Sequence, residues 1–374
     1  HLNASTNAVE GNVIAATFNG TAAQAQVVTN LVGKNTALTT TGAATASDLN
    51  GLFDTTEVGI VVNSTTTISG STTEIAALHS GSVISGTTYA ATISAGTEEA
   101  TALTGMTTTG AVDASLVSTL TGSVSEIEAA QTNTAITLAG DYAAIISAGT
   151  EAATALTGMT TVGAVDASAV TLITSVDTAI GTNASVVVAA LGLTGAGTTV
   201  AATITGSAIS VANANLIDGA TAGIVTASVS ETDATTLATV TNLNANNVTT
   251  ATLNDASVDA TVLNALNAAL TLTVDAAVVT VNIDGSDLTA DTAVEMTDAL
   301  ALTDNAAAIV IGSTISVAAV NAIDGATTGI IQLVVSEQDA ATLLTVDDAN
   351  DNNVIHATLN DASVDATELN ALNA

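Results

Sequence analysis

The chain has 374 residues, in which 35 Asp and Glu face a single Lys or Arg, Lys34, so that its formal net charge is −34. This charge excludes a nucleic-acid binder, because such a protein needs clustered Lys and Arg to displace counterions from phosphate. The lack of cysteine in the sequence excludes disulfides, cysteine-ligated metals and thiol catalysis. We expect surroundings in which salt or divalent cations screen the carboxylates, since unscreened like charges repel one another.

A glycine ladder runs through the first half of the chain. An aliphatic residue, one small residue and a glycine recur about every eighteen residues, with the glycines at Gly33, Gly51, Gly70, Gly86, Gly105, Gly122, Gly140 and Gly158. A short fixed period is typical of a solenoid, in which each turn buries its apolar face against its neighbours. Aromatic residues are only 1% of the chain, so we expect a narrow core of small and β-branched side chains.

Longer duplications support a repeat architecture. Residues 89–115 recur at 142–168 with three changes, an offset of 53 residues, and a second repeat has an offset of 106 residues. Three turns of about 18 residues or two of about 26.5 both fit 53, and the glycine ladder favours three. We predict one continuous solenoid over 1–374, with a change of repeat wording near 190–205. The repeats span 89–141 and 142–194, then 206–311 and 312–374, the last copy being truncated.

Two kinds of segment are expected within each turn. Residues 135–138, 271–274 and 278–281 are rich in β-branched residues and predict short strands. Segments 123–130 and 257–266 begin with Ser and continue with apolar residues at helical spacing, which predicts one or two helical turns. The predicted fold is therefore a repeat solenoid, mainly β: a parallel β-helix with roughly 18-residue coils and short helical turns.

The sequence offers little for catalysis. The three histidines, His1, His79 and His356, are far apart and lack metal-ligand spacing. A glycan-processing β-helix would need paired carboxylates together with basic and aromatic residues, and this chain supplies only the carboxylates. We predict no enzymatic activity and no catalytic residue.

Calcium is the one cofactor worth considering. Asp284, Asp287 and Asp291 offer oxygen ligands around a glycine turn, and the acidic run 347–353 offers more. Asp and Asn beside Gly also form ordinary turns, so the alternative is a diffuse ion atmosphere around structural turns. The repeated Asp218 and Asp324 predict turns, and Asp255 and Asp361 predict helix starts.

Several further partners follow from the sequence. Five N-x-S/T sequons make glycans an option, at Asn3, Asn19, Asn63, Asn183 and Asn247. The sequence has no stretch of eighteen uninterrupted apolar residues, so we predict no membrane insertion. The chain begins with His rather than Met, and we expect a processed or internal segment. Parallel strands leave unpaired edges at the ends of a sheet, which predicts self-association, as a homopolymer or with neighbouring repeats of a longer chain.

The segment TALTGMTTTGAVDASLVSTLTGSVSEIEAAQTN, residues 101–133, carries a resemblance. It is similar to the repeats of giant cell-surface proteins of marine cyanobacteria, rich in Thr, Ala, Val and Asp and nearly free of Lys and Cys. The resemblance is closest over about 70–190 and looser over 206–374. It implies an extracellular structural or adhesive role, and it transfers no catalytic residue.

These observations predict an extracellular structural protein: a rigid acidic solenoid that builds a fibre, sheath or surface layer and assembles end to end. The alternative is an adhesin stalk or an ice-binding or surface-binding protein presenting ranks of Thr, such as residues 65–67 and 107–109. A glycan-processing enzyme is the third reading. The irregular sequence spacing of these Thr runs counts against the alternative.

Overall fold

A computed structural model gives the fold of the chain. It describes residues 17–21, 37–56, 59–62, 64–160, 163–177, 184–195, 198–241, 246–274, 280–284, 292–303, 306–347 and 353–372. The fold is α/β, with parallel strands in several sheets and thirteen helices among the described residues. Two compact units are distinguished: residues 1–173 with 189–196, and residues 174–188 with 197–374.

The first unit contains three sheets whose neighbouring strands run parallel. One sheet has the order β1 (Thr17–Gly20), β2 (Ala37–Thr40), β4 (Ile60–Val61), β6 (Ile84–Ser85). The next has β3 (Gly42–Thr45), β5 (Thr66–Gly70), β7 (Ala90–Ile93), β9 (Val112–Ala114), β11 (Ile136–Leu138). The third has β8 (Gly96–Glu99), β10 (Val117–Gly122), β12 (Ala143–Ile146), β14 (Val165–Asp166), and β13 (Gly149–Ala152) follows β12 in the chain.

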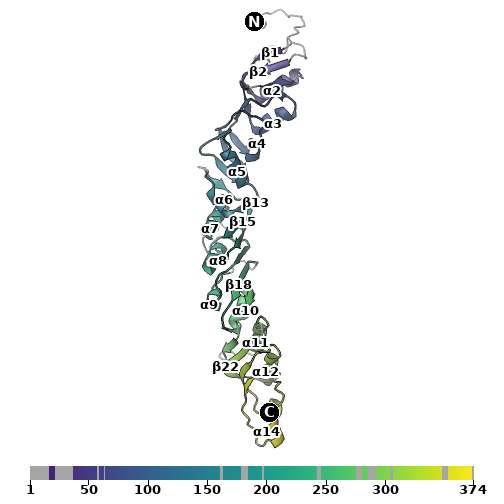
Figure 1. Ribbon diagram of the computed structural model, residues 1–374, viewed down its shortest axis with the longest axis vertical. Coiled ribbons are helices and arrows are strands. Elements are labelled where there is room, and N and C mark those ends of the chain that lie inside the picture. Colours follow the sequence, from purple (N-terminus) through teal and green to yellow (C-terminus); the bar gives the residue numbers. More distant parts are fainter. Residues whose placement is uncertain are drawn as a thin grey trace, which may run out of the picture. The chain divides into compact units, whose positions relative to one another are not determined.

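Short helices separate the strands of this unit and follow one another in chain order (Figure 1). They are α2 (Ala46–Thr56), α3 (Thr72–Ser80), α4 (Ala100–Thr104), α5 (Val124–Thr132) and α6 (Ala153–Gly158). Ser71 and Ser123 precede α3 and α5, and each forms a capping box with a Glu three residues later. Each helix buries one narrow stripe, for example Thr72, Ile75 and Leu78 of α3. The core is therefore thin, as the shortage of aromatic residues predicts.

The second unit repeats the same construction. One run of parallel strands is β16 (Ala201–Gly206), β17 (Val225–Ser228), β18 (Val248–Leu253), β20 (Thr271–Val274). The other is β19 (Ser257–Asp259), β21 (Thr280–Asp284), β22 (Ala307–Ile315), β23 (Ile331–Val335), β24 (Val354–His356). The helices are α8 (Val211–Asp218), α9 (Ala234–Leu237), α10 (Ala260–Ala269), α11 (Thr292–Leu300), α12 (Val317–Asp324), α13 (Ala340–Leu343) and α14 (Ala366–Leu372); β15 (Val170–Asp177) and α7 (Ala184–Leu193) contain the points where the chain passes between units.

The expected local elements are confirmed where the structure describes them, except at the start of the segment 257–266. Residues 136–138 and 271–274 are strands, and 124–132 is a helix. The segment 257–266 begins as a strand and becomes helical only after Asp259, whose side chain caps α10. Of 278–281, residues 280–281 belong to β21, and the first two lie outside the described residues.

The 18-residue coil and the mainly β content are wrong. Gly42 of β3 pairs with Thr66 of β5, and Thr280 of β21 pairs with Ala307 of β22, so a turn is longer than the expected coil. Successive helices, such as α3 and α4, begin at comparably wide intervals. The helix content is substantial, and Ser or Asp side chains cap seven of the described helices, namely α3, α5, α8, α9, α10, α12 and α13. Two strand-and-helix segments, rather than three short coils, make up the shorter repeat, and a turn denotes below one such segment, from a strand to its parallel partner.

The glycine ladder misleads because its described members occupy four different structural positions, the first being the interior of α2, where Gly51 lies. Gly70 and Gly122 end strands immediately before helix caps, and Gly86 and Gly140 follow strand ends. The remaining kind terminates a helix: Gly105 is the C-cap of α4, and Gly158 is the last residue of α6. Three non-equivalent glycines in each shorter repeat therefore imitate an 18-residue period.

The repeat also explains why the fold has several sheets. Ala91 of β7 pairs with Val112 of β9, but the duplicate of Ala91, Ala144 of β12, lies in the neighbouring sheet. Ala91 and Ala144 are separated by one shorter repeat, which contains two turns, so each turn averages half of that separation. This average is longer than the number of residues between paired strands in the first of these sheets, such as from Gly42 to Thr66. Strand positions therefore drift along the chain, and the strands of these two sheets alternate in sequence, β8 preceding β9 and β10 preceding β11.

Candidate functional site

Carboxylates of the second unit cap helices of the preceding turn. The backbone N–H of Val211, the first residue of α8, donates to Glu231 over 2.9 Å, and that of Ala234 in α9 donates to Asp255 over 2.6 Å. The second copy of the longer repeat contains both bonds again: Val317 to Glu337 at 3.0 Å and Ala340 to Asp361 at 2.7 Å. An anion is favourable here because a helix N-terminus presents unpaired N–H groups and the positive end of the helix dipole.

The first unit uses the same device. The N–H of Thr72 in α3 donates to Glu98 over 3.4 Å, and its hydroxyl forms a short hydrogen bond with the same carboxylate. The N–H of Val124 in α5 donates to Glu151 over 3.3 Å. Burial raises the pKa of Glu151, and the bond from Val124 lowers it by less, while the nearby Glu126 and Glu128 raise it further. We call the six acceptors, Glu98, Glu151, Glu231, Asp255, Glu337 and Asp361, the cross-turn caps.

A second repeated contact closes the helix ends. Asp218, the last residue of α8, is only 2% exposed and accepts 2.6 Å from the side-chain amide of Asn247. The amide oxygen of Asn247 in turn accepts from the N–H of Val225 over 2.8 Å. Asp324 and Asn353 repeat the amide contact at 2.7 Å. Asp218 and Asp324 thus lie at helix ends. Asp255 and Asp361 lie at helix starts, as expected, but the helices are those of the preceding turn.

Hydroxyl side chains form columns on the solvent faces of the sheets. Register pairs Thr45 with Ser69, Ser69 with Thr92, Thr92 with Asp113 and Asp113 with Thr137, none of them buried. In the second unit the column is Ser228, Thr250 and Thr271, and the first two hydroxyls lie 2.7 Å apart.

The Thr runs singled out in the sequence are not these columns. Thr66 is fully buried, and its hydroxyl donates to the carbonyl of Thr40. Thr108 donates to the carbonyl of Tyr89, so it serves a bend between turns. Sequence spacing could not reveal the columns because strand register, rather than a run of adjacent Thr, aligns them.

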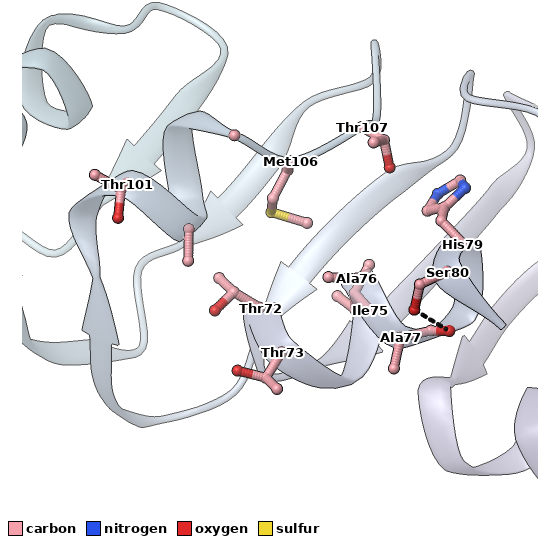
Figure 2. A pocket seen from close by; sticks show the side chains of 12 residues that line it. Thr72, Thr73, Ile75, Ala76, Ala77, His79, Ser80, Thr101, Met106 and Thr107 are labelled. Carbon is pink, nitrogen blue, oxygen red and sulfur yellow. Dashed lines mark hydrogen bonds between the residues drawn. The ribbon is translucent and has the colours of Figure 1, made fainter.

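A pocket of about 500 Å³ lies between α3 and α4. Figure 2 shows Met106 and the methyl groups of α3 facing this space, with His79 and Thr107 toward one end. The lining residues are Thr72, Thr73, Ile75, Ala76, Ala77, His79, Ser80, Thr101, Ala102, Gly105, Met106 and Thr107. No carboxylate is among them.

One end of the pocket is fixed by a ring pair. The Nε2 of His79 lies 2.9 Å from the phenol oxygen of Tyr89, and the two rings stack with centroids 5.7 Å apart. Burial lowers the pKa of His79 below its ordinary value of 6.5. Burial raises the pKa of Tyr89, against a smaller lowering by its hydrogen bond with Thr107. His79, which the sequence left without a role, is thus neutral and anchored at neutral pH.

The side chains of the three proposed calcium ligands lie outside the part of the chain that the structure describes. Asp284 ends β21, but its side chain, and all of Asp287 and Asp291, lie outside the described residues. Of the acidic run, Asp347 donates its N–H to Asn321 over 2.9 Å. Within the described ranges, no three His, Asp or Glu side chains are grouped so that they could hold a metal ion.

The sequence has two other histidines. His356 is exposed in β24, and His1 lies outside the described residues.

No helix in the described part of the chain is long and apolar enough to cross a membrane. Comparison of the chain with family models, curated proteins and solved structures finds no match in any of the three.

Proposed function

We propose that the chain is a structural protein of the cell exterior, a rigid acidic solenoid that builds a fibre, sheath or surface layer. The observation that carries this proposal is the set of cross-turn caps. Each places a carboxylate of one turn on the helix N-terminus of the preceding turn, 20 to 27 residues back. Acidic residues are thereby used to hold consecutive turns together, a role suited to a stiff building material rather than to catalysis.

The solenoid itself is part of the proposal. Within each unit, in-register parallel strands and helices recur at similar intervals, which is the pattern expected when turns stack on their neighbours. The resemblance of residues 101–133 to repeats of cell-surface proteins supports an extracellular location.

Self-association is supported by the exposed apolar surface of the turn 353–372. Leu369 of α14 is 53% exposed, whereas Leu263 of α10, its equivalent in the preceding copy of the repeat, is buried. In that earlier copy α10 packs against α11 and β20. We propose that an equivalent turn covers α14, supplied either by a second copy, so that copies join end to end, or by a neighbouring repeat of a longer chain.

Electron microscopy and sedimentation velocity of the purified chain test this function. The expected result is filaments that Leu369→Glu disperses, because a charge would be buried in the joint. Leu116→Glu is the matched control, since Leu116 is 58% exposed in the first unit and lies outside the joint. Dispersed particles of the unsubstituted chain, with and without calcium, would refute assembly.

The hydroxyl columns favour a second candidate, binding to an ordered surface such as ice. Neighbouring parallel strands are about 4.8 Å apart, so register alone spaces the backbone positions of Ser228, Thr250 and Thr271 evenly. This function predicts thermal hysteresis that is abolished by Thr271→Lys. Thr154→Lys, on the surface of α6, should preserve it. A chain without thermal hysteresis would eliminate this function.

A further inference from the structure

The grooves between successive helices are bridged by side-chain amides in four places. Gln131 of α5 donates to the hydroxyl of Thr160 over 2.9 Å. In the second unit three Asn side chains each donate over 2.8 Å to a backbone carbonyl. Asn264 reaches Glu295 within the next helix, whereas Asn215 and Asn321 reach Thr239 and Thr345 just beyond it. Each of these four bonds ties its helix to the next.

The groove between α3 and α4 lacks such a bridge. His79 stands eight residues after the cap Ser71, as Gln131 stands eight residues after Ser123. Its ring turns to Tyr89 instead, and among the hydrogen bonds of residues 64–160 none joins α3 directly to α4. The 500 Å³ pocket occupies this unbridged groove (Figure 2).

We propose that this pocket binds a small, neutral, largely apolar molecule. Its volume lies within the usual range for ligand pockets, roughly 300–1,000 Å³. Ile75, Ala76 and Ala102 provide an apolar wall, and Met106 can adapt its flexible thioether to different shapes. The Ser80 hydroxyl already donates to the carbonyl of Ala77, and the Thr107 hydroxyl bonds with Tyr89, so what they offer a ligand is chiefly acceptor capacity.

Charge selects the neutral class. The lining has no carboxylate to pair with a cation, and the net charge of −34 repels anions from the whole surface. The site is independent of assembly into fibres, since every lining residue belongs to α3, α4 and the segment after α4. Binding and filament formation can therefore fail separately.

Titration with N-phenyl-1-naphthylamine, a neutral fluorescent probe, tests the proposal. The expected result is saturable binding at one site per chain. The anionic analogue 1-anilinonaphthalene-8-sulfonate has the same rings and should bind at least about tenfold more weakly. Equal or tighter binding of the anionic probe, or no saturable binding of the neutral one, would overturn the proposal.

Matched variants locate the site. His79→Gln installs the residue found at the bridged groove and should weaken the neutral probe at least about tenfold. Ala77→Phe fills the pocket and should do the same, whereas Ala129→Phe, at the equivalent exposed position of α5, should leave binding unchanged. Circular dichroism checks that each variant is folded. Unchanged binding in both pocket variants, equal loss in Ala129→Phe, or binding confined to associated species would each contradict the assignment.

Discussion

The carboxylate of Asp255 accepts a 2.6 Å hydrogen bond from the N–H of Ala234, the first residue of a helix that lies 21 residues earlier. A local cap, Asp233, already holds the third N–H of that helix. Two N–H groups that a short helix leaves unpaired are thus satisfied from opposite directions along the chain. The local cap starts the helix, and the cross-turn cap ties it to the next turn.

Removing a cross-turn cap should destabilise the fold. We expect Asp255→Ala to lower the free energy of unfolding by about 0.5–2 kcal/mol, the usual effect of losing a helix cap. Asp361→Ala, its repeat equivalent, should have an effect in the same range. Urea unfolding followed by circular dichroism measures both. Asp141, exposed and outside the cross-turn caps, is the control, and Asp141→Ala should change stability by less than about 0.5 kcal/mol. Equal effects at Asp141 and Asp255 would contradict the role of the caps.

The two duplicated tyrosines should respond differently to loss of their hydroxyls. Tyr89→Phe removes the partner of His79 and Thr107, and we expect a cost of about 1–2 kcal/mol. The Tyr142 hydroxyl is buried without a hydrogen-bond partner, so Tyr142→Phe should be neutral or stabilising. Thermal unfolding of the pair provides the comparison. A larger loss at Tyr142 than at Tyr89 would show that the hydrogen bonds of the two copies are assigned wrongly.

His79 should make stability depend on pH just above the range in which carboxylates titrate. Its folded pKa lies below the unfolded value of about 6.5, so the unfolded chain binds more protons below that pH. Stability should therefore be complete above pH 6.5 and fall as the pH drops through 6.5 toward the folded pKa. His79→Gln should reduce this slope. NMR titration of the ring gives the folded pKa directly, and a midpoint above 6.5 would reverse the sign and refute the prediction.

A close approach between turns should make substitution of Gly110 destabilising. A Cβ at Gly110 would lie 2.1 Å from the carbonyl oxygen of Tyr89, and Gly163 repeats the arrangement against Tyr142 at 2.4 Å. Gly110→Ala should cost roughly 1–3 kcal/mol, because backbone must shift to make room. Gly158→Ala is the control, since nothing lies within 4 Å of its Cβ position, and it should be neutral or slightly stabilising. Equal stability of the two variants in urea would contradict the close approach.

Local signals in the sequence predicted elements better than they predicted the period. Ser123 and the apolar spacing after it correctly indicated α5, because a cap and its helix are adjacent in the chain. The length of a turn was mispredicted, since glycines such as Gly105 and Gly122 mark different corners. The two-turn reading of the shorter repeat was open in the sequence, and only strand register decides between the readings.

The contacts between turns could not be predicted from single segments. Asp255 was expected to start a helix, but nothing local indicates that the helix is the one before it. The repeated pairing of Asp218 with Asn247, 29 residues apart, is equally hidden until strands are placed in register. The signal that could have exposed these contacts is joint: each capping residue and its helix recur together in the second copy of the longer repeat.

Hydrogen exchange at the first N–H of each capped helix tests the central claim most directly. In an isolated helix this N–H is unpaired and exchanges freely. The account predicts protection at Val211, Ala234, Val317 and Ala340, and selective loss of protection at Ala234 in Asp255→Ala. Free exchange at all four positions in the unsubstituted chain would contradict the claim that carboxylates join successive turns.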